Sequence, residues 1–471
     1  MKTTTGNIHI LVAVLGAAWF LAGCGQSPAA PSSSWSLDSS GAATQLKQFL
    51  ATQEAQARAL AKSDGNTLPP DFDAFYQAAG KGDWLEASNR FKLMAQGVRN
   101  DSSLRGSWWQ ATLDDYGVFE LFPAGDKYAV AFGHDIIQSI PPGSIYFGGT
   151  DPGRFIITAM MKSHTDGKPF FMLSQNPLAD AGYLHYLRSM YGGKIQTPTD
   201  GDLEKCLRDY LAEAQRRLAH DRQFPNEPRQ VKPGDESVSR DTNGQVQLKS
   251  QMAVIGAREL LTKAIFDQNP GRDFYVEESF PSDWMYPQLE PHGLIMKLNG
   301  QPSAGLSADI VQRDADYWSK YLTPLIGGWL KPGTTLEEVA AFVEKIQVKK
   351  DLDGFAGDLQ FVQNDNACKM FSKLRSSIAG NYAWRAQHAA DAGERKRMND
   401  AADFAFRQAW VLCPDSPEAL YRYINLLLSE GRTADAVLIT ETAAKMPSMQ
   451  GENGGQLHSV IEQLKRFQKA K

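Results

Sequence analysis

The sequence predicts an α/β domain with a small, mostly parallel sheet, combined with all-α regions on both sides of it. Over residues 141–300, short apolar runs alternate with helical patterns, an order typical of parallel strands joined by helices. Residues 41–140 and 301–471 show helical spacing instead. Near the C-terminus, small residues recur at a regular interval, which indicates repeated helical hairpins.

A strand, a glycine-rich turn and a helix follow one another directly in the α/β region. Residues 145–147 form a β-branched and aromatic run that favours a buried strand. Residues 148–153 form the turn Gly-Gly-Thr-Asp-Pro-Gly. Asp151 is the predicted N-cap, with Pro152 at the first helical position and a helix over 155–161. Such turns lie at the carboxyl ends of strands, where α/β proteins usually bind ligands.

Two more predicted strands end in polar residues, and a fourth strand is expected at 294–296. The strand at 170–173 is followed by Ser-Gln-Asn-Pro, and the strand at 274–276 is followed by two glutamates. If these strands are parallel neighbours of the first one, their polar ends meet at one rim of the sheet. The residues of this rim are Gly148, Gly149, Thr150, Asp151, Gln175, Asn176, Glu277 and Glu278.

The rim has two chemical interpretations and a structural one. Backbone N–H groups of the first turn can hold an anion at a helix N-terminus, and two carboxylates can perform acid–base chemistry on a sugar. In the structural interpretation, Asp151 only caps its helix, while Glu277 and Glu278 are a solvated strand end. This interpretation is favoured because capping alone explains Asp151 followed by Pro152.

A loop crowded with aromatic residues and proline is expected to cover the same rim. Its side chains suit sugar or peptide stacking, although packing explains them equally well. The residues concerned are Trp284, Tyr286, Glu290 and His292.

The first two dozen residues are typical of a targeting sequence. Lys2 precedes an apolar run over 10–20, and Leu-Ala-Gly-Cys follows, which resembles a bacterial lipobox. The apolar run is shorter than the roughly 20 residues that span a bilayer. We therefore expect a signal peptide over 1–23, a lipid on Cys24 that anchors the chain in the membrane, and a flexible tether over 24–40. Gly25 indicates a location in the cell envelope at the outer membrane, facing the periplasm.

Composition and motifs limit the function. The 471 residues carry a formal net charge of -5 and no basic tract, so nucleic acid is not an expected partner. The eight histidines form no closely spaced pair, and we expect neither a metal nor a cofactor. The chain contains no Gly-x-Ser-x-Gly elbow, no phosphate loop and no His-Glu-x-x-His motif, so no catalytic residue is predicted.

Three cysteines remain after Cys24. Cys206, Cys368 and Cys413 lie in helical patterns among apolar neighbours, which favours small buried side chains. One disulfide among them is compatible with an oxidising compartment, and the sequence does not choose the pair.

Helical hairpins that resemble tetratricopeptide repeats are expected on both sides of the α/β region. Ala409 and Ala443 are 34 residues apart, which is the period of that repeat, and a helix over 457–467 is expected to cap the stack. In the N-terminal region one such hairpin is expected over 72–96, with a departure at Met94. Its packing residues are Phe75, Ala78, Gly82, Ala87 and Phe91.

Segments 145–155, 174–180 and 274–287 resemble the soluble module of a family of bacterial membrane proteins. Those proteins join a glycosyltransferase-like membrane part, similar to protein O-mannosyltransferases, to an extracytoplasmic α/β and tetratricopeptide-repeat region. The resemblance covers roughly residues 103–447. The family's catalytic acid would lie in the membrane part, for which this sequence has no counterpart, so glycosyl transfer is not carried over. The resemblance implies an envelope module that accompanies glycan or glycoprotein assembly.

Two functions are compatible with these observations. The first is a non-catalytic, lipid-anchored envelope scaffold that binds a protein or peptide partner through its helical repeats. The alternative is an accessory protein of glycan or glycoprotein assembly that binds, or hydrolyses, a glycan or sugar phosphate at the rim.

Overall fold

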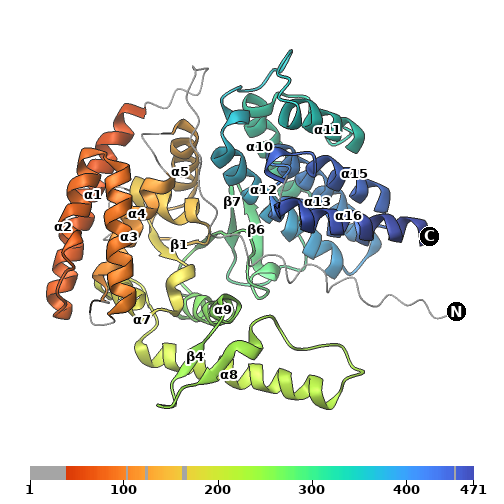
Figure 1. The fold of residues 1–471 in the computed structure, drawn as a ribbon. Helices are drawn as coiled ribbons and strands as arrows, with labels where there is room; N and C mark the ends of the chain where they lie inside the picture. The colour runs from red at the N-terminus through yellow and green to blue at the C-terminus, as the bar shows by residue number, and fades with distance from the viewer. Residues whose placement is uncertain are drawn as a thin grey trace.

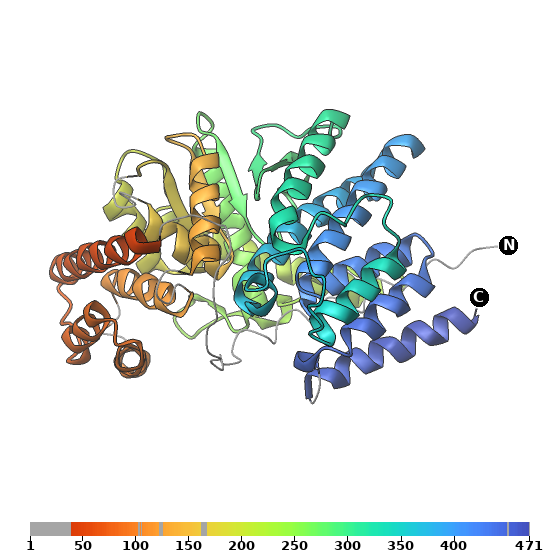
Figure 2. The same cartoon turned by 90° about the horizontal axis from the view of Figure 1, so that it is seen from above.

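The computed structural model describes residues 39–101, 104, 106–121, 126–161, 167–449 and 452–470. The predicted signal peptide, Cys24 and most of the tether lie outside the described residues. Helices make up 66% of the structure, around one small mixed sheet. Figure 1 shows the sheet in the middle, the N-terminal helices on one side and the C-terminal helices on the other, and the view from above in Figure 2 shows the same division.

The helices before the sheet include the hairpin predicted over 72–96. Gly82 ends the first helix of this hairpin in a left-handed conformation (φ 76°), and the Asp83 carboxylate caps the second by accepting the Glu86 N–H at 3.2 Å. Phe75 and Phe91 of this hairpin are buried. The helices are α1 (Ser39–Asp64), α2 (Asp71–Lys81), α3 (Trp84–Asn100), α4 (Trp108–Leu121) and α5 (Lys127–Ser139).

The sheet has five strands in the order β2-β1-β5-β7-β6. The strand β1 is parallel to both of its neighbours, whereas β7 runs antiparallel to β5 and to β6. The predicted strands at 145–147, 170–173, 274–276 and 294–296 are therefore present. The strands are β1 (Ile145–Gly148), β2 (Phe171–Ser174), β5 (Phe274–Glu277), β6 (Leu289–His292) and β7 (Ile295–Leu298).

The prediction of a mostly parallel sheet is wrong for the half that contains β6 and β7. These two strands are joined by a two-residue turn in which Gly293 has φ 61°. Such a short connection allows only an antiparallel pair, because parallel strands need a crossover of about a dozen residues. The sequence did not predict β6, since Pro291 interrupts its pattern, and proline within a sheet is confined to edge strands.

The outer edge of β2 is covered by two tyrosine side chains. The Tyr183 hydroxyl oxygen accepts the Ser174 N–H at 2.6 Å, and the Tyr191 hydroxyl oxygen lies 3.2 Å from the Met172 nitrogen and 2.9 Å from its carbonyl oxygen. Both tyrosines come from α7 (Ala181–Tyr191). The backbone groups on this edge are therefore satisfied by side chains instead of a further strand.

Helical segments connect the parallel strands. The chain after β1 turns into a π-helix, η2 (Pro152–Ile156), and the short α6 (Ile157–Met160). After β2 follow η4 (Asn176–Ala179), α7, α8 (Asp200–Gln223) and α9 (Gln251–Gln268). Between α8 and α9, η5 (Asp235–Ser237) leads into a separate two-stranded sheet of β3 (Val238–Arg240) and β4 (Val246–Leu248), which extends with α8 from the body in Figure 1.

The C-terminal part is helical, as predicted. Ala409 and Ala443 are both fully buried between packed helices. The Arg375 guanidinium, 2.7 Å from the Asp314 carboxylate and 2.8 Å from the Gln408 side chain, joins three helices in the core. The elements are η6 (Tyr286–Gln288) before β6, then α10 (Ala308–Ile326), α11 (Leu336–Val343), η7 (Glu344–Val348), η8 (Phe361–Gln363), α12 (Asp365–His388), α13 (Ala392–Leu412), α14 (Pro417–Ser429), α15 (Thr433–Ala443), η9 (Pro447–Met449) and α16 (Glu452–Ala470).

The three cysteines of the described residues are free thiols. Cys368 and Cys413 are buried, as the sequence predicts, and Cys206 on α8 is partly exposed. Among the described residues, we find no helix with the length and apolar character needed to cross a membrane.

Candidate functional site

The rim predicted from the sequence lies at the carboxyl ends of three parallel strands. Gly148, at the end of β1, is aligned with Ser174 of β2 on one side and with Glu277 of β5 on the other. The chain leaves β1 toward β2 and later crosses to β5, so the strand order reverses between β1 and β5. In α/β proteins, ligands bind beside such a reversal.

The Glu277 carboxyl group fills this position. Its Oε2 atom accepts the N–H groups of Gly149 at 3.3 Å and Thr150 at 3.0 Å, and its Oε1 atom accepts the Thr150 hydroxyl at 2.6 Å. The residue is 1% exposed. The backbone donors that could hold an external anion therefore hold a side chain of the same protein.

The glycines of the turn make room for two carboxyl groups. A Cβ atom on Gly153 would lie 1.6 Å from Glu277 Oε2, and one on Gly149 would lie 2.1 Å from Glu278 Oε2. Neither contact is compatible with a side chain at the glycine. Close approach, and not a special backbone conformation, explains why these two positions carry glycine.

Burial raises the pKa of Glu277 to about 7, with a further rise from Glu278 and an opposing effect of the hydrogen bonds from Thr150 and Gly149. A carboxyl group of this pKa exchanges protons at neutral pH, as a general acid or base must. However, both Glu277 oxygens are bonded to the turn, and neither is presented to a substrate. This geometry argues against acid–base chemistry at Glu277.

The second glutamate of the rim belongs to a network with α9. Arg258 Nη2 lies 3.5 Å from Glu278 Oε2, and Arg258 Nη1 donates a hydrogen bond to Asn176 Oδ1. Asn176 in turn donates to the Gly149 carbonyl oxygen at 3.2 Å. Gln175 is 2% exposed, and its side-chain nitrogen has no hydrogen-bond partner among the described residues. Because Glu277 and Glu278 are both buried, they are not the solvated strand end of the structural interpretation.

The predicted N-cap role of Asp151 is wrong. Asp151 already has helical dihedral angles and makes no capping bond, whereas the Thr150 hydroxyl oxygen accepts the Gly153 N–H at 3.1 Å. Threonine and aspartate have the same capping chemistry, so the cap lies one residue earlier than expected. The Asp151 carboxylate lies 3.4 Å from Arg154 Nε and is 41% exposed, which makes it an accessible group of the rim.

One charged residue of the C-terminal helices, Lys373, interacts with the rim, and the sequence did not indicate it. Lys373 of α12 lies 3.1 Å from Glu418 of α14, and their side chains are 29% and 18% exposed. Burial alone lowers the pKa of Lys373, but Glu418, Asp151 and Glu277 together raise it. This cation therefore lies within electrostatic range of the rim and links the two parts of the molecule.

The aromatic loop expected over the rim has another structure. Glu290 and His292 belong to the edge strand β6, two strands away from β5, and His292 Nε2 lies 2.8 Å from the Ser139 carbonyl oxygen. Tyr286 stacks on Trp384, and His388 stacks on Trp384 with ring centroids 4.0 Å apart. Trp284 packs against Phe266 of α9. Because these rings pack on one another, they do not form an open stacking platform.

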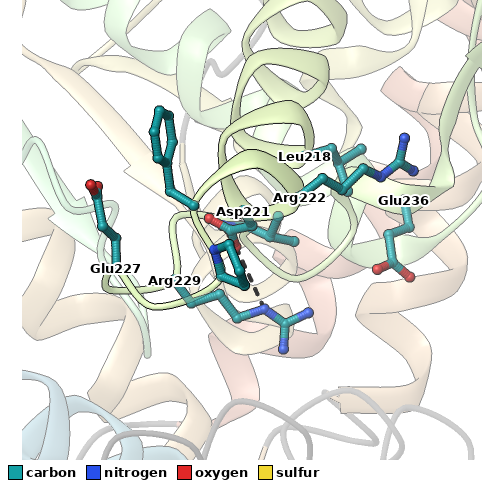
Figure 3. A pocket seen from close by; sticks show the side chains of 9 residues that line it. Leu218, Asp221, Arg222, Glu227, Arg229 and Glu236 are labelled. Carbon is teal, nitrogen blue, oxygen red and sulfur yellow. Dashed lines mark hydrogen bonds and ion pairs between the residues drawn. The ribbon is translucent and has the colours of Figure 1, made fainter.

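Two cavities among the described residues lie away from the rim. One of about 620 Å³ lies at the end of α8 and is lined by Phe224 together with acidic and basic side chains (Figure 3). Another of about 480 Å³ lies between the starts of α10 and α13. Within the described part of the chain, no group of three histidine, cysteine, aspartate or glutamate side chains is arranged to hold a metal ion.

Comparison of the chain with models of protein families, with curated proteins and with solved structures gives no match.

We predict that Gly153→Ala destabilises the protein by about 1–3 kcal/mol, because the new methyl group overlaps the Glu277 carboxyl. Urea unfolding of the full chain in detergent measures this change. Gly80→Ala in α2 is the matched control: no atom lies within 4 Å of its new Cβ, and it should stabilise by about 0.5–1 kcal/mol. A Gly153→Ala protein as stable as the wild type would contradict the proposed contact.

Proposed function

We propose that the protein is a lipid-anchored scaffold of the bacterial cell envelope that binds an extended peptide segment of a partner protein. We define the inner face of the C-terminal helices as Ser377, Asn381 and Arg385 of α12 with Tyr421, Arg422 and Asn425 of α14, and the proposed binding surface is the part of this face on α14. No catalytic step is part of this proposal.

The observation that carries the proposal is how α12 holds a segment of its own chain, the 3-10 helix η6 and the start of β6. Asn381 Nδ2 donates to the Leu289 carbonyl oxygen at 3.2 Å, and Arg385 donates to the same oxygen at 2.9 Å and to that of Pro287 at 3.2 Å. Ser377 donates to the Glu278 carbonyl oxygen. These side chains recognise main-chain carbonyl groups, which every peptide carries.

The three α12 residues of the inner face form a stripe along one side of the helix. Ser377, Asn381 and Arg385 are four residues apart, and residues at this spacing lie on one face of a helix. All three are buried by the segment that they hold. The part of the inner face on α12 is therefore occupied, and a partner needs the part on α14.

The part of the inner face on α14 carries similar groups, two of which remain available. Tyr421, Arg422 and Asn425 are partly exposed. The Tyr421 hydroxyl and the Asn425 amide make no hydrogen bond with the described residues. Arg422 makes no ion pair with them, but it donates to the Tyr286 hydroxyl oxygen at 3.4 Å and lies over the Phe280 ring. Arg422 also reaches the Ser376 carbonyl oxygen on α12 at 3.3 Å, so the two parts of the face are adjacent. An extended peptide can thus continue along α14 with the same kind of contact.

The helical hairpins support a repeat architecture of the tetratricopeptide type. The helices α12 to α16 pack in sequence order, with α14 against both α13 and α15, and the two alanines one period apart are fully buried. Stacked hairpins of this kind form extended concave surfaces for binding.

The alternative of a glycan or sugar-phosphate site at the rim has less support. The Glu277 carboxyl already takes the backbone N–H groups of the turn, and the Trp384 ring has stacked neighbours in Tyr286 and His388. These N–H groups are therefore not free to hold an anion, and this ring is not free to stack on a sugar.

We predict that a photo-crosslinking amino acid at Tyr421 captures a partner protein in cells. The matched control is the same amino acid at Lys396, an exposed position on α13 outside the inner face, where no adduct is expected. Asn425→Ala and Arg422→Ala should each lower the yield about 5- to 100-fold, since each lost hydrogen bond costs about 1–3 kcal/mol. Equal adducts at both positions, or an adduct unaffected by these substitutions, would reject the inner face as the binding surface.

The lipid anchor has a test of its own. We predict that Cys24→Ser abolishes labelling of the protein with radioactive palmitate and moves the protein from the membrane fraction to the soluble fraction, because acyl chains anchor by their own burial. Cys206→Ser, which changes a partly exposed thiol of α8, should leave both properties unchanged. Persistent labelling of the Cys24→Ser protein would show that a lipid is attached elsewhere, and a wild-type protein without label would show that it carries no lipid.

A further inference from the structure

Arg422 of α14 carries a positive charge that forms no ion pair with any described residue. Its Nη1 atom donates to the Ser376 carbonyl oxygen at 3.3 Å, and its Nη2 atom donates to the Tyr286 hydroxyl oxygen at 3.4 Å. Both acceptors are neutral, and both distances are longer than is usual for N–H···O bonds. The side chain is only partly exposed, and a cation shielded from water is normally paired with an anion. Arg422 therefore lacks a counter-ion.

Neighbouring residues hold the Arg422 guanidinium in position. Its central carbon lies 4.2 Å from the centroid of the Phe280 ring. A Cβ atom on Gly380 of α12 would lie 3.1 Å from the same carbon, so the absence of a side chain at Gly380 makes room for the guanidinium. A guanidinium that is already held loses little side-chain freedom on binding, and it presents its remaining N–H groups in a fixed, planar arrangement.

The acidic residue one turn before Arg422 on α14 is engaged elsewhere. Glu418 lies four residues before Arg422, a spacing at which helical side chains can meet. Its carboxylate instead lies 3.1 Å from Lys373 Nζ and accepts the Ser416 hydroxyl at 3.0 Å. The Lys373–Glu418 pair is thus neutral as a whole, and the charge of Arg422 remains uncompensated beside it.

Two further groups next to Arg422 are open to a ligand. The Phe280 ring, which the guanidinium contacts, is 51% exposed. Asn425 lies three residues after Arg422 on the same side of α14, and its amide makes no hydrogen bond with the described residues. A cation, an exposed aromatic ring and an unpaired amide therefore lie close together. These groups are complementary to a carboxylate, an apolar side chain and a peptide group, respectively.

We propose that Arg422, Phe280 and Asn425 form a site for an acidic segment of the partner peptide. A side-chain carboxylate of the segment pairs with Arg422, a neighbouring apolar side chain packs on Phe280, and Asn425 takes a main-chain group. This inference rests on the proposed function and names the class of peptide that it binds. An arginine guanidinium suits this role because it offers a carboxylate two parallel N–H groups.

The carboxylate belongs to a side chain within the segment and not to a chain end. On the adjacent α12, Arg385 holds the carbonyl groups of Pro287 and Leu289 in a segment that continues through β6. A partner peptide bound in the same way passes along the face and continues beyond it. Its only negative charges at this point are then those of aspartate or glutamate side chains.

Selection from a phage library of short random peptides tests the site. The full chain in detergent micelles is the bait, and each peptide is fused to the coat protein at its C-terminus, so that it has no free terminal carboxylate. The recovered peptides should be enriched in aspartate or glutamate beside an apolar residue. With Arg422→Glu as bait, the enrichment should change to lysine or arginine. A change of preference of this kind cannot result from unfolding of the variant.

The acidic peptide recovered most often, synthesised with acetylated and amidated ends, is then the probe for affinity by fluorescence anisotropy. Arg422→Gln in the protein, and the change of the acidic residue to its amide in the peptide, should each weaken binding about 10-fold. The two changes together should weaken it little more than either alone, because they remove the same contact. Lys396→Gln, which removes an equal charge from the exposed side of α13, should leave the affinity unchanged.

The outcomes separate this site from the proposed function. A selection that recovers no peptide rejects both. Peptides whose binding is lost in Asn425→Ala, but which are not enriched in acidic residues, leave the proposed function in place and overturn the acidic site. The site is also overturned if Arg422→Glu recovers the same acidic peptides, or if the losses caused by Arg422→Gln and by the amide peptide multiply.

Discussion

The contact between the Glu277 carboxyl and the turn after β1 fixes the structure of the rim at the carboxyl ends of the parallel strands. It occupies the place between two parallel strands where an α/β protein usually accepts a ligand. It also dictates the sequence of the turn, since Gly149 and Gly153 leave room for carboxyl oxygens, and Thr150 supplies both an N–H and a hydroxyl. A motif that looks like a ligand-binding loop is thus largely explained by an internal side chain.

Hydrogen bonds from α12 side chains to main-chain carbonyl groups join the C-terminal helices to the α/β part. The stripe on α12 donates hydrogen bonds to carbonyl groups of the stretch from Glu278 to Leu289. The helical hairpins are therefore tied to the α/β part and do not form an independent module. A partner that binds along α14 would lie next to Lys373 and Glu418, and so next to the rim.

Local patterns were sufficient to predict the strands and their meeting at one rim, because a buried strand has a distinct composition and parallel strands align their ends. The N-cap was placed at Asp151, since the sequence does not reveal that Glu277 engages the neighbouring Thr150. The strand β6 was missed because Pro291 interrupts it. Lys373 and Ser377 could not be predicted, since they lie far along the chain from the residues they face; the Ser377 bond to Glu278, for example, spans 99 positions.

Both edges of the sheet carry features that disfavour additional strands. Tyrosine hydroxyls cover the outer backbone groups of β2, and Pro291 leaves β6 without one of its N–H donors. Exposed sheet edges carry a risk of edge-to-edge aggregation, and these two features oppose it. They also disfavour a partner that would bind by β-augmentation.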